Sequence, residues 1–398
     1  RPIRGALPIA IQARKEGFKG MILPRANARE AAIVDDLDVF GVDNLEEAIS
    51  VVQSSGHHKP TEVETRALFQ QKRKESDFDF CDVKGQEKIK RAMEIAAAGG
   101  HNVILIGPPG AGKTMLARRL PTILPPLSLV EALETTKIHS VSGLLPENTA
   151  LMPQRPFRSP HHTISNVALV GGGSNPMPGE ISLAHNGVLF LDELPEFQRQ
   201  VLEVLRQPME ERRVTISRAK ITVDYPASFM LIASMNPCPC GFYNHPEKDC
   251  MCGPGEVKRY LNKISGPLLD RIDLHVEVTP VSYDELSDFK PAKEKSSDIR
   301  QRVEYAREKQ ATRFEGMSIY SNAQMPSHLV RKNCQLKNES SALLKRAMEQ
   351  LQLSARAYDR IVKVARTIAD LAGEAEIESA HIAEAIQYRN LDRSGWAG

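Results

Sequence analysis

Gly107-Pro108-Pro109-Gly110-Ala111-Gly112-Lys113-Thr114 has the spacing Gly-x-x-x-x-Gly-Lys-Thr, the signature of a phosphate-binding loop. The apolar run His101–Ile106 before it predicts a buried strand, and Met115–Leu120 after it predicts a helix. In such a loop, glycines let backbone N–H groups close around phosphate oxygens, and the lysine brings a positive charge to the β- and γ-phosphates. The alternative, a fortuitous glycine turn, is weak in this strand–loop–helix context. We therefore predict an ATP site formed by this loop and Met115.

A second element is the apolar strand Val188–Leu191, which ends in two adjacent carboxylates. Charge at the end of a buried strand is costly unless it has a partner. We expect Asp192 to hold Mg²⁺ together with the Thr114 hydroxyl, and Glu193 to polarise the attacking water. The alternative is that the strand simply ends in two solvated carboxylates. The phosphate loop in the same chain disfavours this alternative.

Three further residues are predicted to complete the catalytic site. Asn236 follows the apolar strand Phe229–Ala233, so it can orient the water beside Glu193. Arg271 and Arg356 are candidates for stabilising transition-state charge at the γ-phosphate, in cis or in trans. For either arginine taken alone, a surface salt bridge is the competing interpretation. The predicted catalytic set is Lys113, Asp192, Glu193, Asn236, Arg271 and Arg356.

Length and composition fit a globular protein of two or three domains. The chain has 398 residues, 41% hydrophobic and 26% charged, with a net charge of +2, so a polyanion would need a local basic cluster. No apolar run approaches the ~20 residues of a membrane span, and no signal-peptide pattern is present. Six cysteines form no disulfide framework in a chain of this size, which favours a reducing, cytoplasmic location without a membrane partner. The opening Arg1-Pro2-Ile3-Arg4-Gly5 lacks an initiator methionine and indicates a truncated chain.

Changes in pattern along the chain predict an α/β protein of four segments. Residues 1–53 alternate helical and strand patterns, and 54–79 form a polar linker. Residues 80–280 form an α/β nucleotide-binding domain with an inserted loop region at 140–187, and 281–398 are helical. Within the first segment the predicted elements are helices at 6–16, 28–33 and 44–52 and strands at 20–24 and 39–41, with Asn44 as an N-cap.

The loop 238–252 contains four cysteines in two Cys-x-Cys pairs. Soft ligands this close in sequence suit a structural, tetrahedral Zn²⁺, although the pairs are tighter than the usual Cys-x₂₋₄-Cys knuckle. The alternatives are four reduced thiols, or His245 in place of one thiolate. The predicted zinc ligands are Cys238, Cys240, Cys250 and Cys252.

A basic segment at Arg212–Tyr225 alternates apolar and polar residues and predicts a β-hairpin. A row of lysine and arginine on a hairpin can neutralise nucleic-acid phosphates without sequence preference, whereas the competing interpretation is a solvated face. The loop with Arg155, His161 and His162 is a second candidate, for phosphate contact or for loop hydrogen bonding. The predicted DNA contacts are Arg212, Arg213, Arg218, Lys220 and Arg158.

The order of these motifs resembles that of AAA+ P-loop ATPases, and their details resemble the magnesium-chelatase-like branch. Closer still is the resemblance to the YifB/ComM family of bacteria, which covers essentially the whole chain. The motifs that carry it, besides the phosphate loop and the Asp192-Glu193 strand, are Phe80-Cys-Asp-Val-Lys-Gly85-Gln86, Arg158-Ser-Pro-His-His162, Ser234-Met-Asn-Pro-Cys-Pro-Cys-Gly241 and Gly266-Pro-Leu-Leu-Asp-Arg-Ile-Asp273.

The resemblance implies an AAA+ core with a helical lid, assembled as a homo-hexamer with nucleotide at each interface. Asn236 would be sensor 1, Arg271 an arginine finger and Arg356 sensor 2. The implied activity is ATP-dependent movement on single-stranded or branched DNA, with branch migration in natural transformation and homologous recombination. The segment before Asp43 resembles the tail of a Lon-protease-like domain without its catalytic pair, so no peptidase activity is expected.

Two other functions remain open on the residues alone. One is a magnesium-chelatase-type ATPase that remodels a protein partner, and the basic hairpin argues mildly against it. The other is a nucleotide-gated binding module, which a complete set of acid, sensor and finger residues disfavours.

Overall fold

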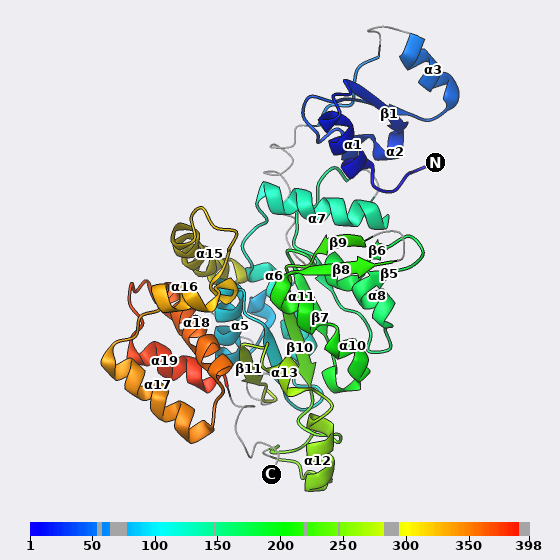
Figure 1. The fold of residues 1–398 in the computed structure, drawn as a ribbon. Helices are drawn as coiled ribbons and strands as arrows, with labels where there is room; N and C mark the ends of the chain where they lie inside the picture. Colours follow the sequence, from blue (N-terminus) through cyan, green and yellow to red (C-terminus); the bar gives the residue numbers. More distant parts are fainter. Residues whose placement is uncertain are drawn as a thin grey trace.

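A five-stranded parallel sheet forms the centre of the molecule, in the order β11-β3-β10-β7-β4 (Figure 1). The computed structural model describes residues 1–53, 58–63, 78–146, 149–218, 222–245, 247–281 and 294–389. The strands are β3 (Val103–Ile106), β4 (Phe157–Arg158), β7 (Val188–Leu191), β10 (Met230–Met235) and β11 (Leu274–Glu277). The predicted α/β class is confirmed.

Both faces of the sheet are buried, which explains why its strands are continuous apolar runs. Successive side chains of a strand point to opposite faces. Accordingly, Val103 and Leu105 of β3 belong to one hydrophobic cluster, and Ile104 and Ile106 to another. The first face is covered by α5 (Glu87–Gly99), α6 (Lys113–Ile123), α15 (Ser296–Arg313) and α18 (Ala355–Ala372). The second is covered mainly by α8 (Asn166–Val170), α9 (Glu180–Leu183), α10 (Arg199–Glu203), α12 (Pro254–Leu261) and α13 (Gly266–Leu269).

The C-terminal part of the described chain is helical, as predicted, and lies on one flank of the core (Figure 1). Its helices α15 and α18 both pack against α5. Helix α18 begins after Ser354, whose hydroxyl accepts a hydrogen bond from the Ala357 N–H at 3.2 Å, and it ends at Gly373 with φ +86°. The remaining helices are α16 (Ser327–Asn333), α17 (Asn338–Leu351) and α19 (Ser379–Gln387).

The N-terminal segment is a small α/β unit, and its predicted alternation of helices and strands is confirmed. Its two strands, β1 (Gly20–Pro24) and β2 (Asp38–Val42), pair in parallel. The Asn44 side chain accepts a hydrogen bond from the Glu47 N–H at 2.9 Å, as expected of an N-cap. The helices are α1 (Ala6–Lys15), α2 (Arg25–Ala31) and α3 (Leu45–Gln53), and α1 packs on α7 (Leu129–Ser142) of the core (Figure 1).

The prediction of an inserted loop over 140–187 is wrong in detail. The segment holds the end of α7, strand β4, helices α8 and α9, and a short pair of strands, β5 (Gly171–Gly172) and β6 (Met177–Pro178). Its glycines and prolines break these elements into pieces too short for a periodic pattern to appear. Helix α7 itself was not predicted, although Ser128 and Glu131 form a capping box at its start.

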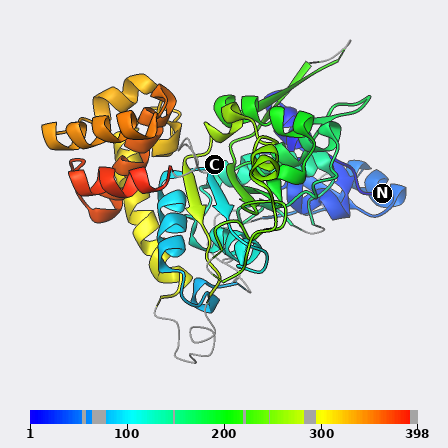
Figure 2. The same cartoon turned by 90° about the horizontal axis from the view of Figure 1, so that it is seen from below.

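The predicted hairpin is present as β8 (Arg213–Ser217) and β9 (Thr222–Pro226), which pair antiparallel. Its strands extend beyond the body of the core (Figure 2). The hairpin follows β7 through η2 (Leu194–Glu196), α10 and α11 (Arg206–Glu211). Most of the predicted linker, at 54–57 and 64–77, lies outside the described residues. Within the described part of the chain, no helix combines the length and apolar character needed to cross a bilayer.

Candidate nucleotide site

The predicted catalytic residues of the core gather where the parallel strands end. We call this side of the sheet, formed by the residues that follow Ile106, Leu191 and Met235, the carboxyl edge. The phosphate loop follows β3, the two carboxylates follow β7, and Asn236 follows β10. In open α/β sheets, ligands bind at this edge.

Lys113 lies at the centre of the carboxyl edge. Its Nζ donates to the carbonyl oxygens of Gly107 at 2.6 Å and Pro108 at 2.9 Å, and to Asn236 Oδ1 at 3.1 Å. Burial lowers the pKa of Lys113 below its ordinary value, and the negative charges of the two carboxylates after β7 counter part of that shift. The ammonium group is therefore held in the loop by weak neutral acceptors, which anionic phosphate oxygens can replace.

Asp192 is fixed by three neighbouring donors. Its Oδ2 accepts from Thr114 Oγ1 at 2.8 Å, and its Oδ1 accepts from the Ser234 hydroxyl and from the Glu193 N–H. A carboxylate in contact with a threonine hydroxyl supplies the hard oxygen donors that Mg²⁺ prefers. The residues present thus fit a magnesium ion held by Thr114 and Asp192.

Glu193 differs from Asp192 in being open to solvent, with 58% of its side chain exposed. Its backbone has φ +53°, a left-handed conformation that non-glycine residues seldom adopt and that is often found at functional sites. The His162 Nδ1 lies 3.9 Å from Glu193 Oε2, and this imidazole packs against His161 and the edge of Phe197. Exposure leaves the carboxylate free to accept a hydrogen bond from water, as a general base requires.

Two glycines allow close approaches around the phosphate loop. A Cβ on Gly107 would lie 2.2 Å from the Val278 carbonyl oxygen, so a side chain there would displace β3 from the residues that follow β11. A Cβ on Gly241 would lie 2.5 Å from Pro109 Cδ. The cysteine loop therefore packs directly on the phosphate loop.

The four cysteines predicted as zinc ligands come together. Their Sγ atoms all lie within 4.8 Å of one another, with Cys238 and Cys240 at 3.3 Å. A hydrogen bond from the Phe242 backbone lowers the pKa of Cys240 to about 6, whereas burial and the neighbouring Cys240 and Cys238 thiols raise the pKa values of Cys250 and Cys252. Cys240 therefore ionises before Cys250 and Cys252. Four soft donors at such separations fit a tetrahedral Zn²⁺ with no open coordination position.

His245 is not part of this cluster. Its Nδ1 accepts hydrogen bonds from the backbone N–H groups of Glu247 at 3.0 Å and Lys248 at 3.1 Å. The histidine stabilises the turn of the loop, and the four-cysteine set is favoured over the alternative in which His245 replaces a thiolate.

The two arginines predicted to act on the γ-phosphate have other partners in this chain. Arg271 is 8% exposed, donates to the Pro267 carbonyl at 2.6 Å and pairs with Glu210 at 2.5 Å. Arg356, in the first turn of α18, is 64% exposed and pairs with Asp270 at 3.5 Å. The structure does not bring either side chain to the phosphate loop of its own chain, and their roles as finger and sensor remain predictions.

The basic residues of the hairpin occupy different environments. Arg212 lies at its base in a left-handed conformation, φ +55°, with its side chain half-buried and donating to Ser228 Oγ at 3.3 Å. Arg213 is exposed and pairs with Glu211 at 3.4 Å, and Arg218 is exposed near the far end of β8. Among the described basic residues of the hairpin, Arg213 and Arg218 are therefore the exposed ones.

Two further candidate DNA contacts differ from these. Lys220 lies outside the described residues. Arg158 forms a bidentate pair with Glu180, at 2.6 and 2.7 Å. The hydrogen bonds to this carboxylate raise the pKa of the Arg158 guanidinium above its ordinary value. DNA contact by Arg158 remains a prediction, and it would require exchange of this partner.

Two residues of the site, Ser234 and Gln86, had no assigned role from sequence, and His162 was a candidate only for phosphate contact or loop hydrogen bonding. The Ser234 hydroxyl bonds Asp192 and accepts from the Glu193 N–H at 3.3 Å, and His162 approaches Glu193. Gln86 Nε2 donates to the Ala111 and Thr279 carbonyls, both at 3.1 Å, and so ties the start of α5 to the phosphate loop. Each lies in one of the long motifs quoted above, and that position was the available signal.

A phosphate loop, a pair of carboxylates and a polar asparagine on adjacent strands of one parallel sheet define a P-loop ATPase of the AAA+ class. Comparisons with known proteins specify the branch. Residues 79–286 match the family model for magnesium chelatase, subunit ChlI, and residues 293–389 match the model for the C-terminal part of that subunit.

Two bacterial relatives illustrate a similarity that extends over almost the whole of this chain. The chain is 43% identical to competence protein ComM of Haemophilus influenzae, over 99% of this chain and 76% of the relative. It is 44% identical to YifB of Escherichia coli, over 99% of this chain and 75% of the relative. A magnesium-chelatase 38 kDa subunit of Cereibacter sphaeroides is 25% identical over 40% of this chain. The chain belongs to the YifB/ComM family of magnesium-chelatase-like AAA+ proteins.

Proposed function

We propose that this protein is an ATP-driven DNA motor that assembles as a hexameric ring and migrates DNA branches during natural transformation and homologous recombination. The observation that carries the proposal is the connection between Glu193 and the basic hairpin. Glu193 is the residue before η2, and from it the chain runs through only α10 and α11 to β8. A change at the carboxylate when nucleotide is hydrolysed can thus move the hairpin base.

The chemistry at the carboxyl edge follows from the residues already placed there. Lys113 and the loop N–H groups would hold the nucleotide phosphates, and Thr114 and Asp192 would hold Mg²⁺, which would supply positive charge to the phosphate oxygens. Glu193 accepts a proton from the attacking water, and Asn236 fixes the lysine and the γ-phosphate side of the loop.

The hairpin supports DNA as the substrate. Along β8 the buried residues Val214 and Ile216 alternate with exposed ones, so the strand keeps a polar face beyond the core. Arg213 on this face, and the exposed Arg218 just after the end of β8, can pair with phosphates without reading sequence. The relative named competence protein is consistent with a role in transformation.

Assembly into a ring assigns roles to the two remaining arginines. We infer that Arg271 leaves Glu210 to reach the nucleotide of a neighbouring subunit, and that Arg356 acts as sensor 2. We also propose boundaries at residues 53, 79 and 280, a structural Zn²⁺ at the cysteine cluster, and a Lon-like, inactive N-terminal unit.

The proposal is tested by steady-state ATPase measurements on the purified chain with and without single-stranded and forked DNA. Stimulation by DNA that declines steeply with salt is the expected result. The second candidate is a chelatase-type ATPase that remodels a protein partner, and the 25% identity to a magnesium-chelatase subunit supports it. ATP turnover that is unchanged by every DNA form but rises with a protein partner would favour this candidate.

A further inference from the structure

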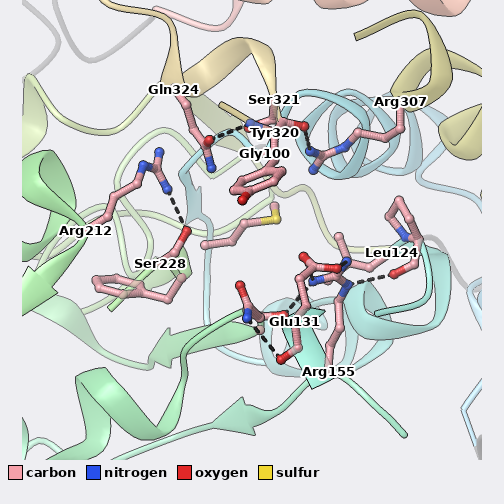
Figure 3. A pocket seen from close by; sticks show the side chains of 15 residues that line it. Gly100, Leu124, Glu131, Arg155, Arg212, Ser228, Arg307, Tyr320, Ser321 and Gln324 are labelled. Atoms are coloured by element: carbon pink, nitrogen blue, oxygen red, sulfur yellow. Dashed lines mark hydrogen bonds and ion pairs between the residues drawn. The ribbon is translucent and has the colours of Figure 1, made fainter. Parts of the chain in front are cut away.

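A small cavity lies between the core and the helical C-terminal region, on the side of the sheet away from the phosphate loop. We call this side, formed by the residues that precede Val103, Val188 and Met230, the amino edge. The cavity has a volume of about 70 Å³, more than a single water molecule requires. Its lining includes Gly100, Gly187, Met230, Ser228 and Tyr320, and three arginines that face it from different elements, Arg155, Arg212 and Arg307 (Figure 3).

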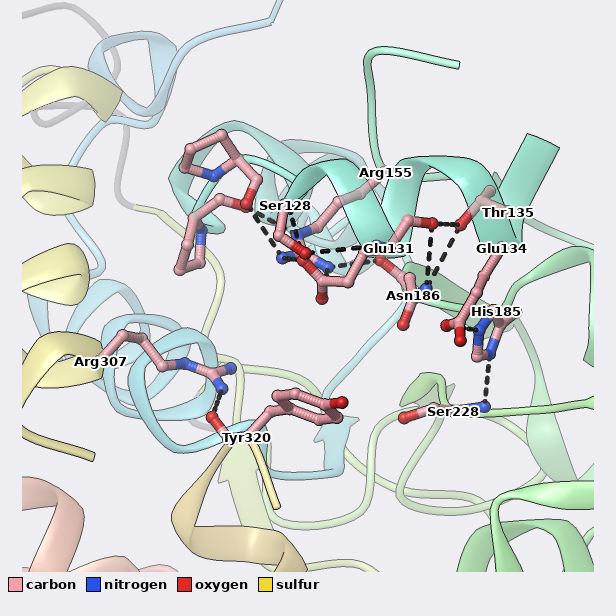
Figure 4. A network of polar contacts seen from close by, with 12 residues as sticks. Ser128, Glu131, Glu134, Thr135, Arg155, His185, Asn186, Ser228, Arg307 and Tyr320 are labelled. Atoms are coloured by element: carbon pink, nitrogen blue, oxygen red, sulfur yellow. Dashed lines mark hydrogen bonds and ion pairs between the residues drawn. The ribbon is translucent and has the colours of Figure 1, made fainter. Parts of the chain in front are cut away.

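The guanidinium of Arg155 has hydrogen-bond partners, and its positive charge is balanced by the Glu131 carboxylate. Its NH1 and NH2 groups pair with the two carboxylate oxygens of Glu131, at 3.1 and 3.3 Å. The same guanidinium donates to the carbonyl oxygens of Pro125 at 2.6 Å and Asn186 at 2.7 Å (Figure 4). This arginine ties α7 to the start of β7 and leaves no charge for a ligand.

Arg307 has only neutral partners. It comes from α15 and donates to the Ala97 carbonyl at 3.0 Å and to the Tyr320 carbonyl at 2.9 Å (Figure 4). Among the described residues, no carboxylate forms an ion pair with it. Burial lowers its pKa to about 9, and the positive charge of Arg155 adds to that effect. The group is still protonated at neutral pH.

Arg212, like Arg307, has a neutral hydrogen-bond partner and no ion-pair partner among the described residues. Its one side-chain hydrogen bond goes to Ser228 Oγ at 3.3 Å, and it too forms no ion pair with a described carboxylate. Burial lowers its pKa to about 10, so it also carries its charge at neutral pH. In Figure 3 the guanidinium groups of Arg212 and Arg307 are drawn on either side of the Tyr320 ring. Among the described residues, the carboxylates that act on these two arginines are already paired: Glu131, near Arg307, with Arg155, and Asp273, near Arg212, with Arg360. The cavity therefore holds two half-buried positive charges without ion-pair partners of their own, and an anion that enters would stabilise both.

We propose that this cavity binds one tetrahedral oxyanion of the phosphate type between Arg212 and Arg307. A phosphate dianion matches the two unbalanced charges, whereas a carboxylate side chain supplies one. Guanidinium groups that approach from separate elements, with the Ser228 hydroxyl beside Arg212, suit an acceptor with oxygens in several directions. The phosphate can be free inorganic phosphate or the terminal phosphate of a DNA strand.

The bound anion connects two parts of the molecule. Arg212 is the residue between α11 and β8, at the base of the hairpin, and Arg307 belongs to the helical C-terminal region. An anion held by both joins the hairpin base to α15. The site is separate from the nucleotide site, and it stands whether or not the protein moves on DNA.

Inorganic phosphate is the probe for the first experiment, measured through the thermal unfolding midpoint of the full chain. The protein is saturated with Mg²⁺ and a non-hydrolysable ATP analogue, so that phosphate cannot act at the phosphate loop. Phosphate is titrated against chloride at constant ionic strength. We expect the midpoint to rise with phosphate in the wild type and in the matched control Arg331→Gln, whose arginine is exposed on α16.

Arg212→Gln and Arg307→Gln are expected to weaken the phosphate response at least tenfold. Without phosphate, Arg212→Gln should unfold at the same temperature as the wild type or a higher one, because an unbalanced charge has been removed. Arg307 also binds two carbonyls, so if Arg307→Gln folds poorly, Arg212→Gln and the charge-retaining Arg212→Lys decide the outcome. A wild type that does not respond to phosphate, or an Arg212→Gln chain that responds normally, overturns the proposal.

Oligonucleotides with a 5′-phosphate or a 5′-hydroxyl distinguish the two sources. A stronger effect of the phosphorylated strand, lost in Arg212→Gln, identifies a strand end as the ligand. Equal effects of the two strands, together with a response to inorganic phosphate, identify the free ion.

Discussion

The two edges of the central sheet differ in how their charged side chains are balanced. At the carboxyl edge, Lys113 faces the carboxylates of Asp192 and Glu193, so charges of both signs meet. At the amino edge, Arg212 and Arg307 share a cavity without an ion-pair partner among the described residues. The difference indicates what each edge takes from outside: a nucleotide together with its metal at the first, and an anion alone at the second.

The largest expected effect is at the carboxyl edge, in Glu193→Gln. Loss of the general base should lower ATP turnover by about 10² to 10⁴-fold while nucleotide binding is kept, because binding rests on Lys113 and the loop. Turnover is measured by phosphate release and binding by a fluorescent ATP analogue. Glu196→Gln is the matched control, since that exposed glutamate pairs with Lys263 and should leave both quantities unchanged. Normal turnover in Glu193→Gln would remove Glu193 from the mechanism.

Asp273→Asn tests charge balance at the amino edge. Asp273 is buried and pairs with Arg360 and His101. Burial alone would raise its pKa, but Arg360 and then His101 hold it far below its ordinary value. Loss of the buried carboxylate leaves the half-buried Arg360 without its ion-pair partner and should cost about 3–5 kcal/mol of unfolding free energy at pH 7.

The pH dependence of this loss has a definite sign. Because the folded pKa of Asp273 is lowered, its contribution is complete above the unfolded value of about 3.9 and declines as pH falls below it. Urea unfolding should give the same gap between wild type and Asp273→Asn at pH 7 and pH 5, and a smaller gap at pH 3.5. Asp270→Asn, which removes only the exposed pair with Arg356, should cost less than about 1 kcal/mol. A gap that widens on acidification would contradict the assignment.

Disruption of the cysteine cluster tests whether the carboxyl edge depends on a metal besides Mg²⁺. Cys238→Ser, or a strong chelator, should release one zinc per chain and lower the thermal unfolding midpoint, because metal-binding energy is folding energy at such sites. Nucleotide affinity should fall as well, since Gly241 packs on Pro109. Cys81→Ser, outside the cluster, serves as control. Metal analysis that finds no zinc in the wild type would refute the site.

The smallest expected effect concerns the exposed end of the hairpin. Arg218→Gln should lower affinity for single-stranded DNA equally for all sequences and reduce the salt slope of binding by about 0.7. Fluorescence anisotropy at several salt concentrations measures the slope. Arg331→Gln, an exposed arginine of α16, should leave it unchanged. An unaltered slope in Arg218→Gln would mean that this residue does not contact the strand.

Much of the carboxyl edge could be predicted from sequence, because its residues lie in contiguous motifs. The loop ending in Thr114 and the strand ending in Asp192 each carry a local pattern, and parallel strands bring such ends together. The contact between Ser234 and Asp192 depends on the register of β10 beside β7, which no local pattern contains.

The amino edge could not be predicted in the same way. Arg212 and Arg307 are far apart in sequence, and neither belongs to a motif with a known spacing. Arg212 was assigned to DNA with the rest of the hairpin, because sequence alone does not show that the strand begins after it. Its left-handed backbone, φ +55°, turns the chain before β8 and leaves its side chain in the cavity.

The most direct test of the account is ATP-driven displacement of a fluorescently labelled strand from a forked DNA. We expect the wild type to displace the strand with ATP and Mg²⁺, Glu193→Gln to displace none, and Arg218→Gln to displace it more slowly. A wild type that hydrolyses ATP at full rate but displaces no strand from any fork or branched substrate would contradict the claim that hydrolysis at the carboxyl edge drives movement on DNA.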